Sequence, residues 1–265
     1  MNPIYLYKLR ILKLTHDINS AVERFDPDAI HDVRVSIRRM VTLCSILEAS
    51  GQAPYSKKEL QILKKKFRRA GALRDIQVQL HLLNEWENRL QDRFELYENH
   101  LRRREKILQQ YFKRAFLTIN LKKTLPDSVG RLLFRHHIEK ELQRLDDDFR
   151  KKSLDVRSLH PLRITAKKLK YTLEIQQACY PGFGPTELFR KHLANVQDLL
   201  GSWHDVEMGL HHLTYFMKRQ KIKTDDQYDS LLILMKREKE MLLLDTQLEL
   251  KNQIPMKELL SVVLT

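Results

Sequence analysis

Two short stretches of this sequence occur twice, in the same order, and they decide the fold. Residues 31–40 read HDVRVSIRRM and align with residues 160–169, HPLRITAKKL, at an offset of 129. Residues 71–78, GALRDIQV, align with residues 201–208, GSWHDVEM, at an offset of 130. Self-similarity at one spacing indicates repeated structural units. The sequence therefore predicts two diverged copies of one helical unit, residues 1–125 and residues 126–265.

The composition favours an all-α fold. Only 7 of the 265 residues are glycine, and 31% are charged, which suits amphipathic helices better than the turns of a β protein. Helical periodicity is interrupted at few points, so we expect about ten helices. Pro27, after an Asp26 cap, and Pro161 suit the first turns of two of them. The expected breaks are Asp26-Pro27, Gly51 to Pro54, Gly71, Pro126-Asp127, the residues before His160, Pro181 to Pro185, and Thr224-Asp225.

Each copy contains a helix with one cationic side. In the first copy His31, Arg34 and Arg38 are spaced i, i+3 and i+7, which places them on one face. The second copy has the same spacing from His160 and extends it by one basic residue. The second row consists of His160, Arg163, Lys167 and Lys170, bordered by Tyr171. Apolar residues occupy a different side of each helix, from Val33 to Leu47 and from Leu162 to Leu173.

Like charges at this spacing destabilise an isolated helix, and no acidic residue lies within either row. We therefore expect a counter-charge from outside, held between two facing rows. The chain has a net charge of +14, which favours an anionic partner such as nucleic acid, acidic lipid headgroups or polyphosphate. Arg and Lys donate charge-assisted hydrogen bonds to phosphate oxygens.

A second group of basic residues lies between Lys57 and Arg69. Leu60, Leu63 and Phe67 mark the buried side of this helix. Lys64 and Arg68 flank that side and could reach the groove, whereas Lys65 and Arg69 point away. A solvated charged face is the alternative explanation for this group.

The paired motifs resemble the signature of the CHAD domain family, the conserved-histidine α-helical domains. The resemblance extends to residues 73–78 and 197–201 and to Asp205, although Val41 and His204 depart from the usual pattern. It implies two four-helix bundles related by pseudo-two-fold symmetry, together forming one domain. It also implies a basic central surface that binds inorganic polyphosphate, without catalysis, cofactor or metal. The predicted polyphosphate-binding residues are His31, Arg34, Arg38, Arg39, Lys64, Arg68, His160, Arg163, Lys167, Lys168, Lys170 and Tyr171.

Two other functions compete with this interpretation. Nucleic-acid binding uses the same phosphate chemistry, but most aromatic residues occupy core-like positions instead of forming a stacking platform. A metal-dependent phosphohydrolase is the weaker alternative. The His-Asp doublets at 16–17, 31–32 and 204–205 suggest it, but the arginines beside His31 would repel a divalent cation. The sequence contains no P-loop, dinucleotide-binding or nucleophile-elbow motif.

The remaining features predict a reduced, cytoplasmic protein. Cys44 and Cys179 lie in helical apolar sequence without paired spacing, which argues against a disulfide scaffold. Lys8, Arg10 and Lys13 interrupt the apolar residues of the first segment, which is unlike a signal peptide. No stretch approaches the roughly 20 apolar residues that cross a bilayer, so no membrane insertion is expected. Family analogy suggests association with polyphosphate granules or other storage bodies.

Overall fold

The computed structural model describes residues 1–52, 55–116, 130–150, 156–181, 187–222 and 226–251, and within them it contains eight α-helices and no strand. The all-helical prediction is confirmed, with eight helices in these ranges where about ten were expected. The helices are α1 (Pro3–Arg24), α2 (Pro27–Ala49), α3 (Lys57–Leu90), α4 (Glu95–Phe116), α5 (Arg131–Arg150), α6 (Val156–Cys179), α7 (Glu187–Gln220) and α8 (Asp226–Lys251). Over the described ranges, none of these helices is long and apolar enough to span a membrane.

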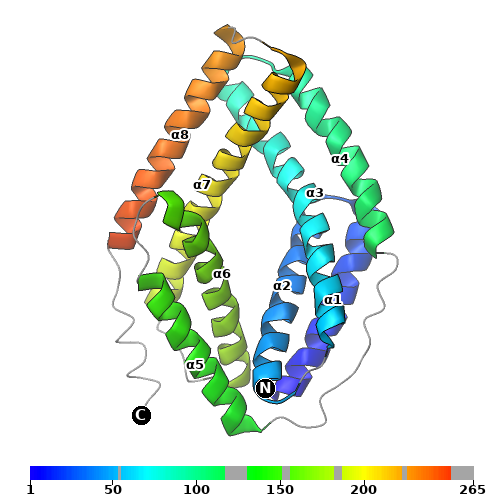
Figure 1. Cartoon of the computed structure of the whole chain (residues 1–265), viewed down its shortest axis with the longest axis vertical. Helices are drawn as coiled ribbons and strands as arrows, with labels where there is room; N and C mark the ends of the chain where they lie inside the picture. Colours follow the sequence, from blue (N-terminus) through cyan, green and yellow to red (C-terminus); the bar gives the residue numbers. More distant parts are fainter. Residues whose placement is uncertain (53–54, 117–129, 151–155, 182–186, 223–225, 252–265) are drawn as a thin grey trace.

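The first four helices lie on one side of the molecule and the last four on the other (Figure 1). Helix α2 contacts α6, and α3 contacts α7, so the two sets meet along these inner helices. Corresponding helices of the two sets have similar lengths, since α3 and α7 both have 34 residues, and α2 and α6 have 23 and 24. The boundary expected between the two copies, at residues 125 and 126, falls outside the described residues.

Local sequence explains where α2 and α3 begin. The Asp26 side chain accepts a hydrogen bond from the Ala29 backbone N–H at 2.8 Å, and Pro27 follows at the first helical position. This confirms the predicted cap. Ser56 and Glu59 form a reciprocal capping box at the start of α3, which satisfies backbone N–H groups that have no partner within the helix.

The predicted break at Gly71 is wrong, because α3 passes through this residue without interruption. Gly71 is instead a point of close approach, since a Cβ atom there would lie 3.1 Å from Nη1 of Arg34. The helix ends only at Gln91, a residue with a left-handed φ of 52° whose N–H donates to the Glu87 carbonyl. Sequence reasoning missed this end because neither Gly nor Pro marks it.

The expectation that Pro161 starts a helix is also wrong. Helix α6 begins five residues earlier, at Val156, and Pro161 lies inside it. Proline lacks the N–H that would bond to the carbonyl four residues before it. Because Pro161 lies near the start of α6, the missing hydrogen bond affects only the beginning of the helix.

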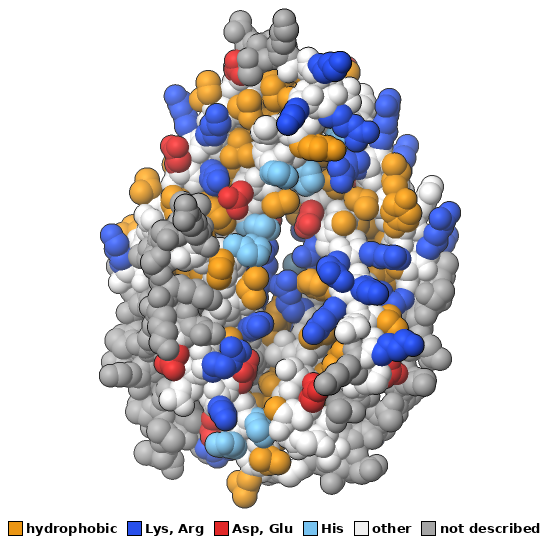
Figure 2. Space-filling view, in the orientation of Figure 1, with side chains coloured by type: hydrophobic (Ala, Val, Ile, Leu, Met, Phe, Trp, Pro, Cys, Tyr) orange, Lys and Arg blue, Asp and Glu red, His pale blue; other side chains and the backbone are white. Residues whose placement is uncertain are grey.

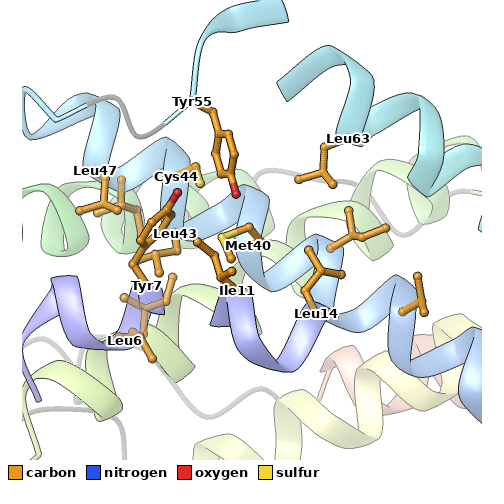
Figure 3. Packing of buried hydrophobic residues seen from close by; sticks show 14 of the residues in the cluster. Leu6, Tyr7, Ile11, Leu14, Met40, Leu43, Cys44, Leu47, Tyr55 and Leu63 are labelled. Carbon is orange, nitrogen blue, oxygen red and sulfur yellow. The ribbon is translucent and has the colours of Figure 1, made fainter. Parts of the chain in front are cut away.

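The two largest hydrophobic clusters of the core are each shared between the two sets of helices. The largest cluster joins α1, α2 and the start of α3 (Figure 3) and extends to α5 and α6. The predicted apolar stripe of α2 is confirmed, because Val33, Ile37 and Met40 are fully buried. A second cluster packs Ile76 and Trp86 of α3 against residues of α7 and α8. Cys44 and Cys179 are both buried and free.

Helices α3 and α7 pack closely around Gly209. A Cβ atom on Gly209 would lie 2.6 Å from Oε1 of Gln79 and 2.9 Å from Cε of Met235. Gln79 also donates from Nε2 to the backbone carbonyl of Asp205 at 2.9 Å. This junction holds the middle of α7 against α3, beside the residues that form the candidate site.

Candidate functional site

The central cleft is a cavity of about 700 Å³ that lies between α2, α3, α6 and α7. Figure 2 shows an opening in the middle of the molecule with Lys and Arg side chains gathered around it. The cleft is lined by His31, Asp32, Arg34, Val35, Arg38 and Arg39 from α2, Phe67, Arg74, Asp75 and Val78 from α3, Arg163, Lys167, Lys170 and Tyr171 from α6, and Gln197, Asp198, Gly201, Ser202 and Asp205 from α7. Each set of four helices thus contributes two walls.

Eight of the twelve predicted binding residues line this one cleft. They are His31, Arg34, Arg38, Arg39, Arg163, Lys167, Lys170 and Tyr171. The two basic rows, which are far apart in sequence, therefore lie beside each other.

The other four predicted residues lie elsewhere. Lys64 and Lys168 line a separate pocket. Arg68 is exposed and lines neither cavity. His160 is exposed outside the cleft lining, with its ring centroid 5.5 Å from that of His204. Contrary to the prediction, these four do not line the central cleft: Lys64 and Lys168 face the separate pocket, and Arg68 and His160 line neither cavity.

Phe67 positions two arginines of the cleft. The guanidinium carbon of Arg34 lies 5.2 Å from the centre of the Phe67 ring, and that of Arg38 lies 4.8 Å from it. A cation is attracted to the face of an aromatic ring at such distances. This contact holds both guanidinium groups at the cleft, and the space left by Gly71 admits that of Arg34.

Carboxylates from α3 and α7 also reach the cleft, contrary to the expectation that the counter-charge is external. Asp75 accepts a hydrogen bond from Arg34 at 3.3 Å. Arg39 also has a partner within the protein, because it donates to both carboxylate oxygens of Glu174 of α6, outside the cleft lining, at 2.7 and 3.0 Å. The lining nevertheless holds seven Lys and Arg side chains against four Asp side chains, so positive charge remains in excess.

Lys167 is the residue most affected by this excess. Burial, followed by the guanidinium groups of Arg163, Arg38 and Arg34, lowers the pKa of Lys167 to about 7. Burial also lowers the pKa of Arg163, whose Nε is buried without a hydrogen-bond partner among the described residues. Both observations indicate charged groups that lack sufficient partners within the protein.

His31 and His204 are held neutral. Burial and then Arg163 lower the pKa of His204 to about 4. Burial and then Arg74 lower the pKa of His31. Desolvation and nearby cations both disfavour a charged imidazole, so at neutral pH the charge of the cleft comes from its Lys and Arg residues.

The family model for the CHAD domain matches residues 11–214 of the chain. This chain belongs to the CHAD domain family. Every residue that lines the central cleft falls within the matched segment. No curated protein matches the sequence at a significant level.

Two solved structures share the fold of this CHAD domain. The crystal structure of the CHAD domain from the plant Ricinus communis superposes with a TM-score of 0.65 at 19% identity, covering 94% of this chain and 90% of that one. PptA from Streptomyces chartreusis superposes with a TM-score of 0.64 at 12% identity, covering 92% and 95% of the two chains. At these identities the similarity concerns the fold.

Sequence reasoning missed several residues of the CHAD cleft. Phe67 was placed on the buried side of its helix, and Arg74, Asp75 and Asp205 were not among the predicted binding residues. Arg74, Asp75 and Asp205 all line the cleft. The signal was present in the second repeated stretch, at residues 71–78 and 201–208, which supplies the walls opposite the basic rows.

Lys66 belongs to the core of the CHAD domain. It is buried, donates to the backbone carbonyl of Ala115 and lies 5.6 Å from the centre of the Phe116 ring. Lys66 lies within the basic stretch from Lys57 to Arg69, but the approach of α4 covers it. Its ammonium group therefore links α3 to α4 and takes no part in the cleft.

Two of the three His-Asp doublets reach the central cleft, through His31, Asp32 and Asp205, and the doublet at 16–17 does not. Asp17 is buried, where it accepts hydrogen bonds from Ser36 at 2.5 Å and from Lys13 at 2.7 Å. Across the part of the chain that the structure describes, no group of three or more His, Cys, Asp or Glu side chains could hold a metal ion.

Proposed function

We propose that this protein binds inorganic polyphosphate in the central cleft and does not catalyse a reaction on it. The observation that carries the proposal is the meeting of two basic rows, from α2 and α6, in a cavity where cationic side chains outnumber carboxylates. A linear anion in this cleft would contact both rows at once. The family relationship supports the same ligand class.

The electrostatics of the cleft favour an anionic ligand. Arg163 and Lys167 lie partly buried among other cations, which disfavours the charged form of each. A phosphate oxygen would supply the missing counter-charge and accept their hydrogen bonds. The charged groups of the cleft are thus arranged to hold an anion, and we propose binding as their role.

Polyphosphate suits this cleft better than nucleic acid. Proteins that bind single-stranded nucleic acid without sequence preference stack its bases on exposed aromatic side chains. The Phe67 ring already carries the guanidinium groups of Arg34 and Arg38, and Tyr171 is only 7% exposed. Neither the phenylalanine nor the tyrosine of the cleft lining therefore offers bases an open stacking face, whereas phosphate groups need only the cationic donors.

We further infer that the chain consists of two copies of a four-helix unit, related by an approximate two-fold axis. The matching lengths of α3 and α7, and the equivalent places of the repeated motifs on α2 and α6, support this inference. The two-fold relation would give a chain-like ligand similar contacts from both sides. Because polyphosphate is the proposed ligand, we also propose that the protein is cytoplasmic and associates with polyphosphate granules.

The test is binding of long-chain polyphosphate to a variant in which Arg34, Arg38, Arg163 and Lys167 are all replaced by Gln. We expect this variant to lose binding at physiological ionic strength while its circular dichroism stays helical. In competition by fluorescence anisotropy, we expect polyphosphate to displace single-stranded and duplex DNA from the wild type at equal phosphate concentration and salt. Unchanged binding by the variant would reject the site, and stronger binding of DNA would favour the nucleic-acid alternative.

A further inference from the structure

A second basic cavity, the lower pocket, lies between α2, α3, α5 and α6. Its volume of about 810 Å³ exceeds that of the central cleft. Its charged lining residues are Lys64, Lys140, Arg144, Lys168, Glu48 and Glu141. Two of these lysines, Lys64 and Lys168, were expected in the central cleft, and the structure instead groups them with two basic residues of α5.

The lower pocket continues the central cleft along the same helix faces. On α3, Leu60 and Lys64 of the lower pocket precede Phe67 of the cleft by seven and three residues, spacings that place all three on one face. On α2, Ser45 of the lower pocket lies two turns beyond Arg38 of the cleft. Lys and Arg side chains also continue below the central opening in Figure 2.

Three lysines of the lower pocket are available to an anion. Lys64, Lys140 and Lys168 are exposed, and the ammonium group of each makes no hydrogen bond or ion pair with another described residue. Glu141, by contrast, is engaged by Arg144 through hydrogen bonds of 2.6 and 2.9 Å. The ammonium groups converge on one cavity from three different helices, which sets them apart from a basic stripe along a single helix.

We propose that the lower pocket is a second anion-binding site, which takes up further phosphate groups of a polyphosphate chain that already occupies the central cleft. The proposal rests on the function proposed above, because the central cleft supplies the first contacts. A short chain then fills the cleft alone, and a long chain spans both cavities. The lower pocket thereby makes the affinity depend on the length of the ligand.

The experiment uses a triple variant of the full chain, in which Lys64, Lys140 and Lys168 are replaced by Gln. Binding is measured for a ladder of polyphosphates, from tripolyphosphate to long chains. We expect binding of the shortest chains to remain as in the wild type, and binding of long chains to weaken on the order of tenfold, with a shallower dependence on salt, because three phosphate contacts are lost.

The matched control replaces Lys65, Lys113 and Lys236 by Gln, which removes the same charge from exposed positions that line neither cavity. Equal weakening by both triple variants would overturn the proposal, since the effect would then follow net charge alone. Unchanged long-chain binding by the lower-pocket variant, or loss of the shortest chains as well, would also overturn it. Failure of the wild type to bind any polyphosphate would instead reject the proposed function.

Discussion

At the scale of single residues, Lys167 shows most clearly how the excess positive charge of the cleft acts on one side chain. An ordinary lysine stays charged far above neutral pH, whereas burial and three neighbouring arginines lower the pKa of Lys167 to about 7. A bound phosphate opposes both causes, because it replaces lost hydration and offsets the positive potential. Ligand binding above pH 7 should therefore include uptake of a proton by Lys167.

The affinity for long-chain polyphosphate should accordingly fall as the pH rises above 7. Once Lys167 is neutral in the free protein, its protonation becomes part of binding, and the dissociation constant should rise by up to about tenfold per pH unit. His31 and His204, whose pKa values are lowered, are already neutral in this range. Isothermal titration in buffers of different ionisation enthalpy would measure the proton uptake between pH 7 and 9.

Lys167→Arg is the control for this prediction, since a guanidinium group stays charged throughout the range. The variant should bind at pH 7 and lose most of the pH dependence. A wild-type affinity that stays constant from pH 7 to 9 would contradict the assignment.

Lys167 also affects the stability of the ligand-free protein, and its lowered pKa determines whether its contribution rises or falls with pH. The unfolded chain binds a proton at Lys167 up to about pH 10, whereas the folded chain releases it near pH 7. Unfolding therefore takes up a proton in this interval, so the contribution of Lys167 to stability rises with pH from 7 to about 10. Below pH 7 the buried charge destabilises the fold.

At the scale of helices, the packing of α7 against α3 holds the walls of the cleft in place. Two glycines of α7 differ sharply in their surroundings. Gly209 has Gln79, Met235 and Trp86 close to where a Cβ would lie, whereas nothing approaches within 4 Å of the same position at Gly201. The two residues therefore form a matched pair on one helix.

Gly209→Ala should lower the melting temperature, and Gly201→Ala should leave it unchanged or raise it. Overpacking at a tight helix contact costs about 1–3 kcal/mol, while replacing glycine by alanine in a helix gains up to about 1 kcal/mol. Thermal unfolding followed by circular dichroism measures both effects. Equal melting temperatures for the two variants would contradict the close contact of α3 with α7.

The helices also show how far the sequence alone predicts this structure. The Asp26 cap, the apolar stripe of α2 and the shared cationic faces follow from local rules of spacing and capping. The course of α3 does not, because Gly71 looks like a break until the Arg34 side chain is seen against it. Likewise, only tertiary packing buries Lys66 and brings Asp75 to Arg34.

At the scale of the whole molecule, the excess charge of +14 is distributed among cavities as well as over the surface. The repeated motifs predicted that two rows would meet, and the structure places eight of the twelve expected residues in one cleft. The division into central cleft and lower pocket depends on how α5 packs beside α2 and α6. Spacing within single helices contains no information about that packing.

The most direct test of the account is a crystal structure of the protein grown with long-chain polyphosphate. We expect a chain of phosphate groups in the central cleft, with oxygens within hydrogen-bond distance of Arg38, Arg163 and Lys167. A polyphosphate chain bound on another surface, with Arg34 still paired to Asp75 and Arg39 to Glu174, would contradict the central claim.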